Sequence, residues 1–271
     1  MTDWLAVCRE AAAGVRGVLS ELPTRYEREP PVGAGEGGDE TTAVDAAAEA
    51  AVLARLEVAH REGAAFTLVS EELGERVFGD GGDGLRVVVD PIDGSMNAKR
   101  GIPFFSLSIA VASGPLMGDV ELGYVYDFGS GEEWVARVDA GAFLDGEPLD
   151  GPGPKVDVEI LAFEATRTDL VAERAAGMVG FAYRTRIMGS LALSLCHLAA
   201  GRVDAVVSLK PARSVDIAAA QLLVRERGLA VDLPEAPPFD AAPLDLAARS
   251  RVVAAASPEV AAEVFARLSA G

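Results

Sequence analysis

The chain has 271 residues, of which 42 are acidic and 24 basic, so its formal net charge is −18, and half of its residues are hydrophobic. This composition excludes an intrinsically disordered protein, and the length allows one large or two ordinary domains. The negative charge excludes nucleic acid as a partner bound through a basic patch. No run of 18 apolar residues occurs, and charges stand at Asp3, Arg9 and Glu10, which predicts a cytoplasmic protein with neither membrane segment nor signal peptide.

The first half of the chain is predicted to be rich in strands. Helices are expected at residues 3–19 and 42–61, and the glycine-rich segment 29–41 between them is expected to be mobile. Runs of β-branched and apolar residues predict strands, which lie at 65–70, 85–90, 104–112, 119–127 and 132–138.

A tract of glycine and proline at residues 150–154 predicts a domain boundary, with an N-terminal α+β domain at 1–148 and a C-terminal domain at 149–271. Strands and helices alternate in the second domain, which indicates an α/β arrangement. Its strands are predicted at 156–163, 180–186 and 203–209. Its helices are predicted at 168–176, 190–200, 215–227 and 257–269.

The most informative motif is Asp90-Pro91-Ile92-Asp93-Gly94-Ser95, which directly follows a predicted strand. Pro91 stiffens the turn between the two carboxylates, and these repel each other unless a cation lies between them. Such hard oxygen ligands suit Mg²⁺, and a helix starting at Gly94 would offer N–H groups to an anion. A metal site beside an anion site indicates a phosphate ester as ligand. The alternative is an ordinary turn at a strand end, without chemistry.

Three further acidic clusters stand at strand ends or helix starts. Glu71 follows an apolar run, and Asp45, with Asp39 upstream of it, lies near the start of the helix at 42–61. Ser214 is a favourable N-cap, so Asp216 is expected in the first turn of the next helix. Acids gathered at such positions favour a site for several metal ions over a solvated surface.

These motifs make the chain resemble the inositol monophosphatase family of Mg²⁺-dependent, typically Li⁺-sensitive phosphatases, which includes fructose-1,6-bisphosphatases and nucleotide-3′-phosphatases. Its signature elements occur here in order, as 70–72, 90–95 and 215–219, within a match from about Asp39 to Ala255. The residues before Asp216 are more similar to the archaeal branch, which often acts on both inositol phosphate and fructose bisphosphate. The resemblance implies a layered αβαβα sandwich of the sugar-phosphatase type, with the metal and phosphate site in the N-terminal domain.

The resemblance also implies roles for individual residues. Two to three Mg²⁺ ions are expected, the first bound by Glu71, Asp90 and the Ile92 carbonyl, the second by Asp90, Asp93 and Asp216, and a weaker third by Glu71 with waters. The expected catalytic residues are Asp45, Glu71 and Ser95. Ser95 would hydrogen-bond the attacking water and pass its proton towards Asp45, while the N–H groups of Gly94 and Ser95 would hold phosphate oxygens.

Several positions depart from the family pattern. Ser95 replaces a threonine, Ala34 stands where many members have a lysine, and Leu209 replaces an acid that often contacts inositol hydroxyls. Arg213 or Lys210 is expected to face a second phosphate, which favours a bisphosphate substrate; the alternative is a surface cation in a loop. A nucleotide-3′-phosphatase and a non-catalytic phosphate-binding relative stay open as alternatives.

The excess of acidic residues over lysines indicates the kind of environment in which the protein works. The chain has only three lysines, Lys99, Lys155 and Lys210, against 42 acidic residues. Acidic, lysine-poor proteins are typical of concentrated salt, so a halophilic source is predicted. The alternative is a genome rich in G and C, which disfavours lysine codons but does not by itself require a charge of −18. A homodimer that binds a small phosphate ester is expected.

Overall fold

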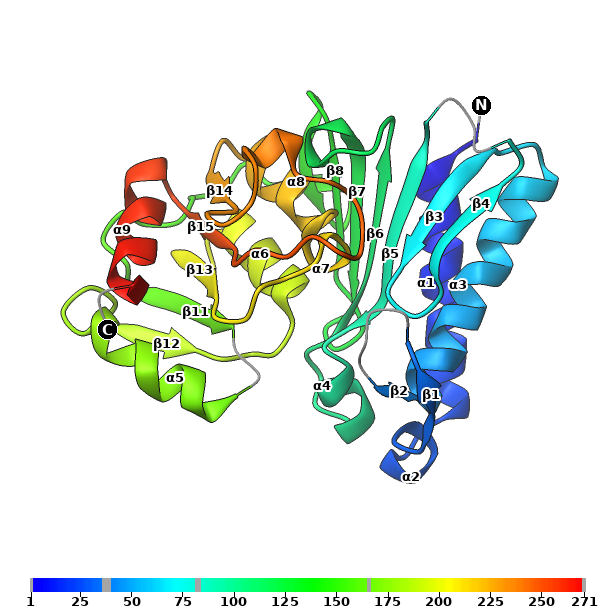
Figure 1. Cartoon of the computed structure of the whole chain (residues 1–271), viewed down its shortest axis with the longest axis horizontal. Coiled ribbons are helices and arrows are strands. Elements are labelled where there is room, and N and C mark those ends of the chain that lie inside the picture. The colour runs from blue at the N-terminus through cyan, green and yellow to red at the C-terminus, as the bar shows by residue number, and fades with distance from the viewer. Residues whose placement is uncertain (1, 36–39, 81–83, 165–166, 270–271) are drawn as a thin grey trace.

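The computed structural model describes residues 2–35, 40–80, 84–164 and 167–269. In that part of the chain, two sheets alternate with helical layers (Figure 1). Helices α1 and α3 cover the outer face of the larger sheet, and α6, α7 and α8 lie between the two sheets. Helices α5 and α9 cover the far face of the smaller sheet. This arrangement confirms the predicted αβαβα sandwich.

The larger sheet has eight strands in the order β10-β9-β8-β7-β6-β5-β3-β4. Its strands are β3 (Phe66–Ser70), β4 (Gly74–Phe78), β5 (Arg86–Asp93), β6 (Ser106–Ala112), β7 (Val120–Asp127), β8 (Glu133–Arg137), β9 (Gly141–Leu144) and β10 (Glu147–Pro148). Neighbouring strands are antiparallel except for β3 and β5, which run parallel. This exception places the carboxyl ends of β3 and β5 at the same edge of the sheet.

The smaller sheet has five strands in the order β12-β11-β13-β15-β14. They are β11 (Ile160–Glu164), β12 (Arg184–Arg186), β13 (Ala205–Ser208), β14 (Ala230–Asp232) and β15 (Val253–Ala255). Strand β11 is parallel to β12 and β13, whereas β15 is antiparallel to both of its neighbours. The C-terminal part therefore builds a mixed sheet in which β11, β12 and β13 coincide with predicted strands, whereas β14 and β15 do not.

The helices differ in length between the layers. The α-helices are α1 (Trp4–Glu21), α2 (Arg25–Arg28), α3 (Ala43–Arg61), α4 (Ser95–Arg100), α5 (Thr168–Ala175), α6 (Leu191–Ala199), α7 (Ser214–Ile217), α8 (Ala220–Glu226) and α9 (Pro258–Ser269). Short 3₁₀ turns lie at η1 (Met117–Asp119), η2 (Ala176–Met178) and η3 (Phe239–Ala241). Among the described helices, none is both long and apolar enough to cross a membrane.

Apolar side chains hold the layers together because successive residues of a strand point to opposite faces of its sheet. In β5, Val87 and Val89 pack beneath α1 and α3, whereas Val88 joins the central cluster under α6 and α8. That central cluster also takes Val206 and Ala254 from the smaller sheet. One apolar cluster therefore joins the two sides of the domain boundary predicted at 148/149, and the division itself stays a prediction.

A glycine allows the central helical layer to approach the larger sheet. A Cβ atom on Gly123 of β7 would lie 2.3 Å from the carbonyl oxygen of Ala219, at the junction of α7 and α8. Any larger side chain would push this junction away from the sheet. The close approach brings α7, with Asp216 on it, over the strand ends that carry the other acids.

The structure corrects several predicted elements. The helix predicted at 215–227 is broken at Ala218, whose carbonyl accepts a hydrogen bond from the buried Gln221 side chain (3.2 Å). A continuous run of small apolar residues carries no signal for that break. Strands β4, β9, β10, β14 and β15 lie where the sequence predicts no strand. In and next to the segment 29–41, β1 (Pro31–Ala34) pairs with β2 (Glu40–Thr42). The mobility of this segment stays a prediction, and residues 36–39, including Asp39, lie outside the described part.

Candidate metal and phosphate site

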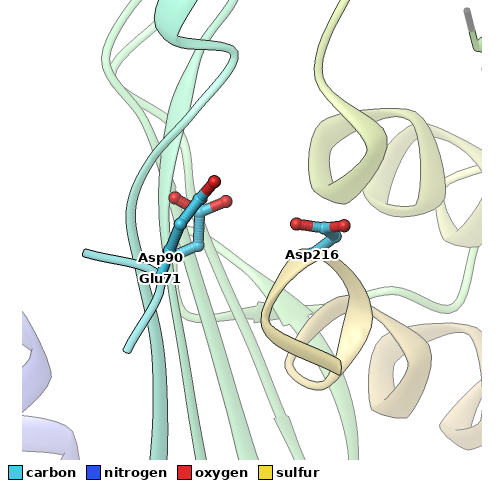
Figure 2. A group of neighbouring side chains, drawn as sticks. All are labelled: Glu71, Asp90 and Asp216. Carbon is cyan, nitrogen blue, oxygen red and sulfur yellow. The ribbon is translucent and has the colours of Figure 1, made fainter. Parts of the chain in front are cut away.

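Three carboxylates from distant parts of the sequence converge at the carboxyl ends of strands β3 and β5. Each of Glu71, Asp90 and Asp216 offers one oxygen, and these oxygens all lie within 4.8 Å of one another. Figure 2 shows Glu71 and Asp90 on one side, with the carboxylate of Asp216 facing them from helix α7. Ser70 pairs with Val89 across the parallel strands, so the residues that follow, Glu71 and Asp90, emerge side by side.

Backbone hydrogen bonding orients Asp216. The N–H of Arg213 donates to Asp216 Oδ2 over 2.7 Å, in the capping arrangement at the start of α7. The prediction that Ser214 is the N-cap is therefore wrong by one residue, because its hydroxyl donates instead to the carbonyl oxygen of Asp245 at 2.6 Å. Asp216 lies in the first turn of the helix, as predicted.

The turn after β5 holds the remaining members of the 90–95 motif. Asp90 Oδ1 accepts a hydrogen bond from the Ile92 N–H (3.0 Å), and the Ile92 carbonyl accepts one from the Ser95 hydroxyl (3.0 Å). Gly94 has a φ of 96°, and a Cβ atom there would lie 3.1 Å from the carbonyl oxygen of Gly189. Both the left-handed conformation and this contact favour glycine.

Asp93 is anchored from the C-terminal side of the molecule. Its Oδ2 accepts hydrogen bonds from the Ser190 hydroxyl (2.6 Å) and from the Ala192 N–H (2.7 Å) at the start of α6. It is therefore not part of the tightest group of described acids, which is Glu71, Asp90 and Asp216. Its fixed carboxylate links the turn after β5 to helix α6.

Of the two carboxylate oxygens of Asp45, one accepts hydrogen bonds from the protein and the other does not. Its Oδ2 accepts hydrogen bonds from the N–H (3.1 Å) and the hydroxyl of Thr42. Its Oδ1 is buried and has no hydrogen-bond partner among the described residues. An unpartnered buried carboxylate oxygen is costly unless water or a ligand satisfies it. In the described part of the chain, no direct hydrogen bond joins Asp45 to Ser95, because the Ser95 hydroxyl donates to Ile92.

Two further residues belong to the site. Arg213 forms ion pairs with Glu71 and, at 3.4 Å, with Asp216. Glu164, at the end of β11, was not predicted; it accepts hydrogen bonds from the Ser194 hydroxyl (2.6 Å) and the Gly189 N–H (2.9 Å). An acid directly after a predicted strand is the same signal that marks Asp90, so the sequence contained the means to find Glu164.

Burial and mutual repulsion raise the pKa values of the clustered acids. Burial, opposed by Arg213 and reinforced by Asp216, raises the pKa of Glu71 to about 8. Burial together with neighbouring Glu71, Asp93 and Asp216 holds the pKa of Asp90 well above its usual range. Burial also raises the pKa of Asp93 to about 7, although the Ser190 hydroxyl opposes this. The site thus lacks enough positive charge for its carboxylates to ionise together.

These residues fit a hard divalent cation. The donors are carboxylate oxygens, which suit Mg²⁺, Mn²⁺ or Ca²⁺, and the unsatisfied Asp45 Oδ1 leaves a place for an ordered water. The cluster opens into a cavity of ≈ 510 Å³ that both parts of the chain line. Residues on its wall include Thr42, Lys99, Gly189, Lys210 and Arg249. A cavity of this size accommodates a small ligand.

A layered αβαβα sandwich with an acidic, metal-compatible cavity between its sheets defines a class of sugar phosphatases. The model of the inositol monophosphatase family matches residues 4–270, so the chain belongs to this family. A protein of Methanothermobacter thermautotrophicus named fructose-1,6-bisphosphatase/inositol-1-monophosphatase is 32% identical over 273 residues, covering 95% of this chain and 93% of that protein.

Two other comparisons extend the likeness. The Nus factor SuhB of Escherichia coli is 35% identical over 232 residues, covering 80% of this chain and 81% of that protein. A crystal structure described as an inositol monophosphatase-fructose 1,6 bisphosphatase aligns with a TM-score of 0.83 and 26% identity, covering 98% of this chain and 100% of that one. The family membership makes the chain a phosphatase that hydrolyses phosphate monoesters.

The raised pKa of Glu71 predicts how the metal-free protein responds to pH. An unfolded glutamate has a pKa of about 4.3, so between that value and about 8 the folded chain binds more protons than the unfolded one. The stabilisation is fully present below about pH 4 and is lost as the pH rises through 8. Melting temperatures in chelator should therefore fall as the pH rises from about 4.3 to about 8, the interval that these two pKa values span.

The Glu71→Gln variant tests whether Glu71 causes this fall in melting temperature. Its residue 71 cannot titrate, so its melting temperature should depend less on pH. The lowered pKa of His197, caused by burial and by Arg202, gives the opposite trend but cancels in the difference between the two proteins. If the melting temperatures of the variant and of the unmodified protein depend on pH in the same way, Glu71 is not the source of the pH dependence.

Proposed function

We propose that the protein is a Mg²⁺-dependent phosphomonoesterase for small sugar or polyol phosphates, inositol-1-phosphate or fructose-1,6-bisphosphate. The observation that carries this proposal is the convergence of Glu71, Asp90 and Asp216 on the wall of a cavity that can take such a ligand. The archaeal relatives named for both activities support the substrate class.

Two to three Mg²⁺ ions would be held by the carboxylates of Glu71, Asp90, Asp93 and Asp216 and by the Ile92 carbonyl. When bound, they would supply Lewis acidity that acidifies water and neutralises the leaving oxygen. Asp93 is supported in this role by its fixed position next to α6, and Asp216 by the capping hydrogen bond from Arg213. A third ion on Glu71 is part of the proposal, although Ala34 replaces the lysine of many relatives.

The chain's own residues would position and move protons. The N–H groups of Gly94 and Ser95 would hold phosphate oxygens, while Ser95 would orient the attacking water and pass one of its protons towards Asp45 Oδ1. The water oxygen forms the new bond to phosphorus and the ester P–O bond breaks. The leaving alkoxide takes up a proton from solvent, and Asp45 releases the proton that it accepted back to solvent. The single unsatisfied oxygen of Asp45 supports its role as acceptor. No covalent phospho-enzyme is needed.

Arg213 and Lys210 are proposed to favour a second phosphate on the substrate. Both line the cavity, and Arg213 lies beside the metal ligands. The nucleotide-3′-phosphatase alternative places the same chemistry on a different alcohol. The other alternative, a non-catalytic phosphate-binding relative, is disfavoured by the family to which the chain belongs. Phosphate release from a panel of the three ester classes, with and without Mg²⁺, separates these functions.

The Asp93→Asn variant tests the catalytic proposal. A neutral amide is a poor ligand for Mg²⁺ and removes one negative charge, so turnover of the best ester should fall by roughly 100-fold or more. The amide oxygen still accepts hydrogen bonds, so the fold should be kept. Released phosphate is measured at saturating Mg²⁺, with circular dichroism as a check on folding.

Asp169→Asn is the matched control, because this aspartate is exposed on α5 and pairs with Arg167 away from the cavity. It should keep the unmodified turnover. Near-normal turnover in Asp93→Asn, or no Mg²⁺-dependent release from any ester by the unmodified protein, would refute the proposal.

We infer a high-salt habitat from the charge of −18. Screening shortens the Debye length from about 30 Å at 0.01 M salt to about 3 Å at 1 M, which relieves repulsion among the acids of the folded chain. The melting temperature in Mg²⁺-free buffer should therefore rise as KCl is increased from about 0.01 M to about 1 M. If the melting temperature stays constant or falls as KCl is increased, the excess of acidic residues is explained by genome bias and not by a high-salt habitat.

The homodimer, the cytoplasmic location and Li⁺ sensitivity stay predictions. Exposed apolar side chains beside the edge strand β12 support self-association, notably Val179, Tyr183 and Ile187. Sedimentation velocity would measure the oligomeric state, and turnover in LiCl against KCl would measure the inhibition.

A further inference from the structure

Arg213 lines the cavity, but its guanidinium is turned towards the acidic cluster. Its guanidinium donates to Glu71 Oε1 and stands 3.4 Å from Asp216 Oδ1, and its side chain is only 11% exposed. Glu71 and Asp216 are 16% and 18% exposed, so the contacts are largely shielded from solvent. The cation is thus held by two of the three carboxylates that converge at the site.

This position has a direct electrostatic consequence. A buried carboxylate cluster needs a compensating charge, and the guanidinium supplies one without any metal. A divalent cation that binds the same oxygens would meet the positive charge of this guanidinium, at a depth where screening by solvent is weak. Arg213 and the metal therefore compete for Glu71 and Asp216.

We propose that Arg213 is the resident cation of the metal-free site, and that a divalent metal ion must displace its guanidinium from Glu71 in order to bind. The proposal rests on the proposed function in one respect, the assignment of Glu71 and Asp216 as metal ligands. The backbone of Arg213 stays fixed during this exchange, because its N–H caps α7 through Asp216 Oδ2. Only the long side chain has to move.

The displaced guanidinium has an anionic partner within reach. Arg213 lines the cavity together with Lys210 and Gly94, where a phosphate ester would bind. A planar guanidinium binds phosphate oxygens in pairs, so a bound phosphate would replace the ion pair with Glu71 that the metal breaks. Metal alone loses that ion pair, whereas metal with phosphate regains an equivalent one. The two ligands should therefore strengthen each other's binding by the same factor.

Calorimetric titration of metal into the metal-free protein tests this exchange. Mg²⁺, and Mn²⁺ as a second probe, are titrated with and without inorganic phosphate into the unmodified protein and into Arg213→Gln. Without phosphate, Arg213→Gln should bind the metal about tenfold more tightly, because no guanidinium has to be displaced. Phosphate should tighten metal binding in the unmodified protein and do so less in the variant.

Lys210→Gln is the matched control in the titrations without phosphate. It removes the same charge from the same cavity wall, but Lys210 is exposed and is not part of the acidic cluster. It should give no comparable tightening. An equal tightening in Lys210→Gln would mean that the total charge of the cavity decides metal affinity, and would overturn the proposal.

Equal or weaker metal binding by Arg213→Gln would also overturn it, since Arg213 would then hold the ligands in place instead of competing for them. If Arg213→Gln does not fold, Arg213→Lys takes its place. A lysine keeps the positive charge but lacks the planar guanidinium group. Its ion pair with Glu71 should therefore be weaker, and metal should bind somewhat more tightly. Unchanged affinity in Arg213→Lys would count against displacement.

Phosphate release measured on the same samples separates the inference from the proposed function. Ester hydrolysis with unchanged metal affinity in Arg213→Gln leaves the function intact and refutes the exchange. Tighter metal binding in the variant, without hydrolysis of any ester by the unmodified protein, supports the exchange and refutes the function. Absence of metal binding by the unmodified protein refutes both.

Discussion

The structure depends on one constraint, which is that three partly or fully buried carboxylates are held closer together than their charges tolerate. Glu71 and Asp90 are adjacent because β3 and β5 are the parallel pair of the larger sheet, and Asp216 reaches them from α7. Since the backbone fixes all three positions, the repulsion is relieved only by protons or by a cation. The raised pKa values and the ion pairs of Arg213 are two responses to the same constraint.

The packing of the central helical layer maintains this constraint. Asp216 can face the strand ends only because α7 and α8 meet against Gly123 without an intervening side chain. A second close contact, between Gly94 and the carbonyl of Gly189, sets the turn after β5 against the segment that precedes α6. Both contacts are between backbones, so they fix the site more firmly than flexible side chains would. The cavity is consequently a product of how the two sheets are joined.

The sequence predicted acids that the fold brings together, Glu71, Asp90 and Asp216, but it predicted the detail of the fold less well. The ends of apolar runs indicate Asp90 and Glu71, and a helix start indicates Asp216, because strand ends and helix starts are where backbone geometry exposes side chains together. The same rule applies to Glu164, but the sequence marks this residue less clearly because no second acid follows it. The break at Ala218 could not be predicted, since it depends on the approach of a distant strand and on the Gln221 side chain. The direction taken by the Arg213 side chain likewise depends on tertiary contacts.

The central claim is that Glu71, Asp90 and Asp216 together bind a divalent metal ion. The crystal structure of the protein crystallised with Mn²⁺ would test it most directly. Anomalous scattering at the manganese edge locates the ion independently of any assumption about its ligands. We expect a peak bounded by the carboxylates of Glu71, Asp90 and Asp216. A fully folded protein with these three side chains in place and no peak between them, at a Mn²⁺ concentration that saturates binding in solution, would contradict the account.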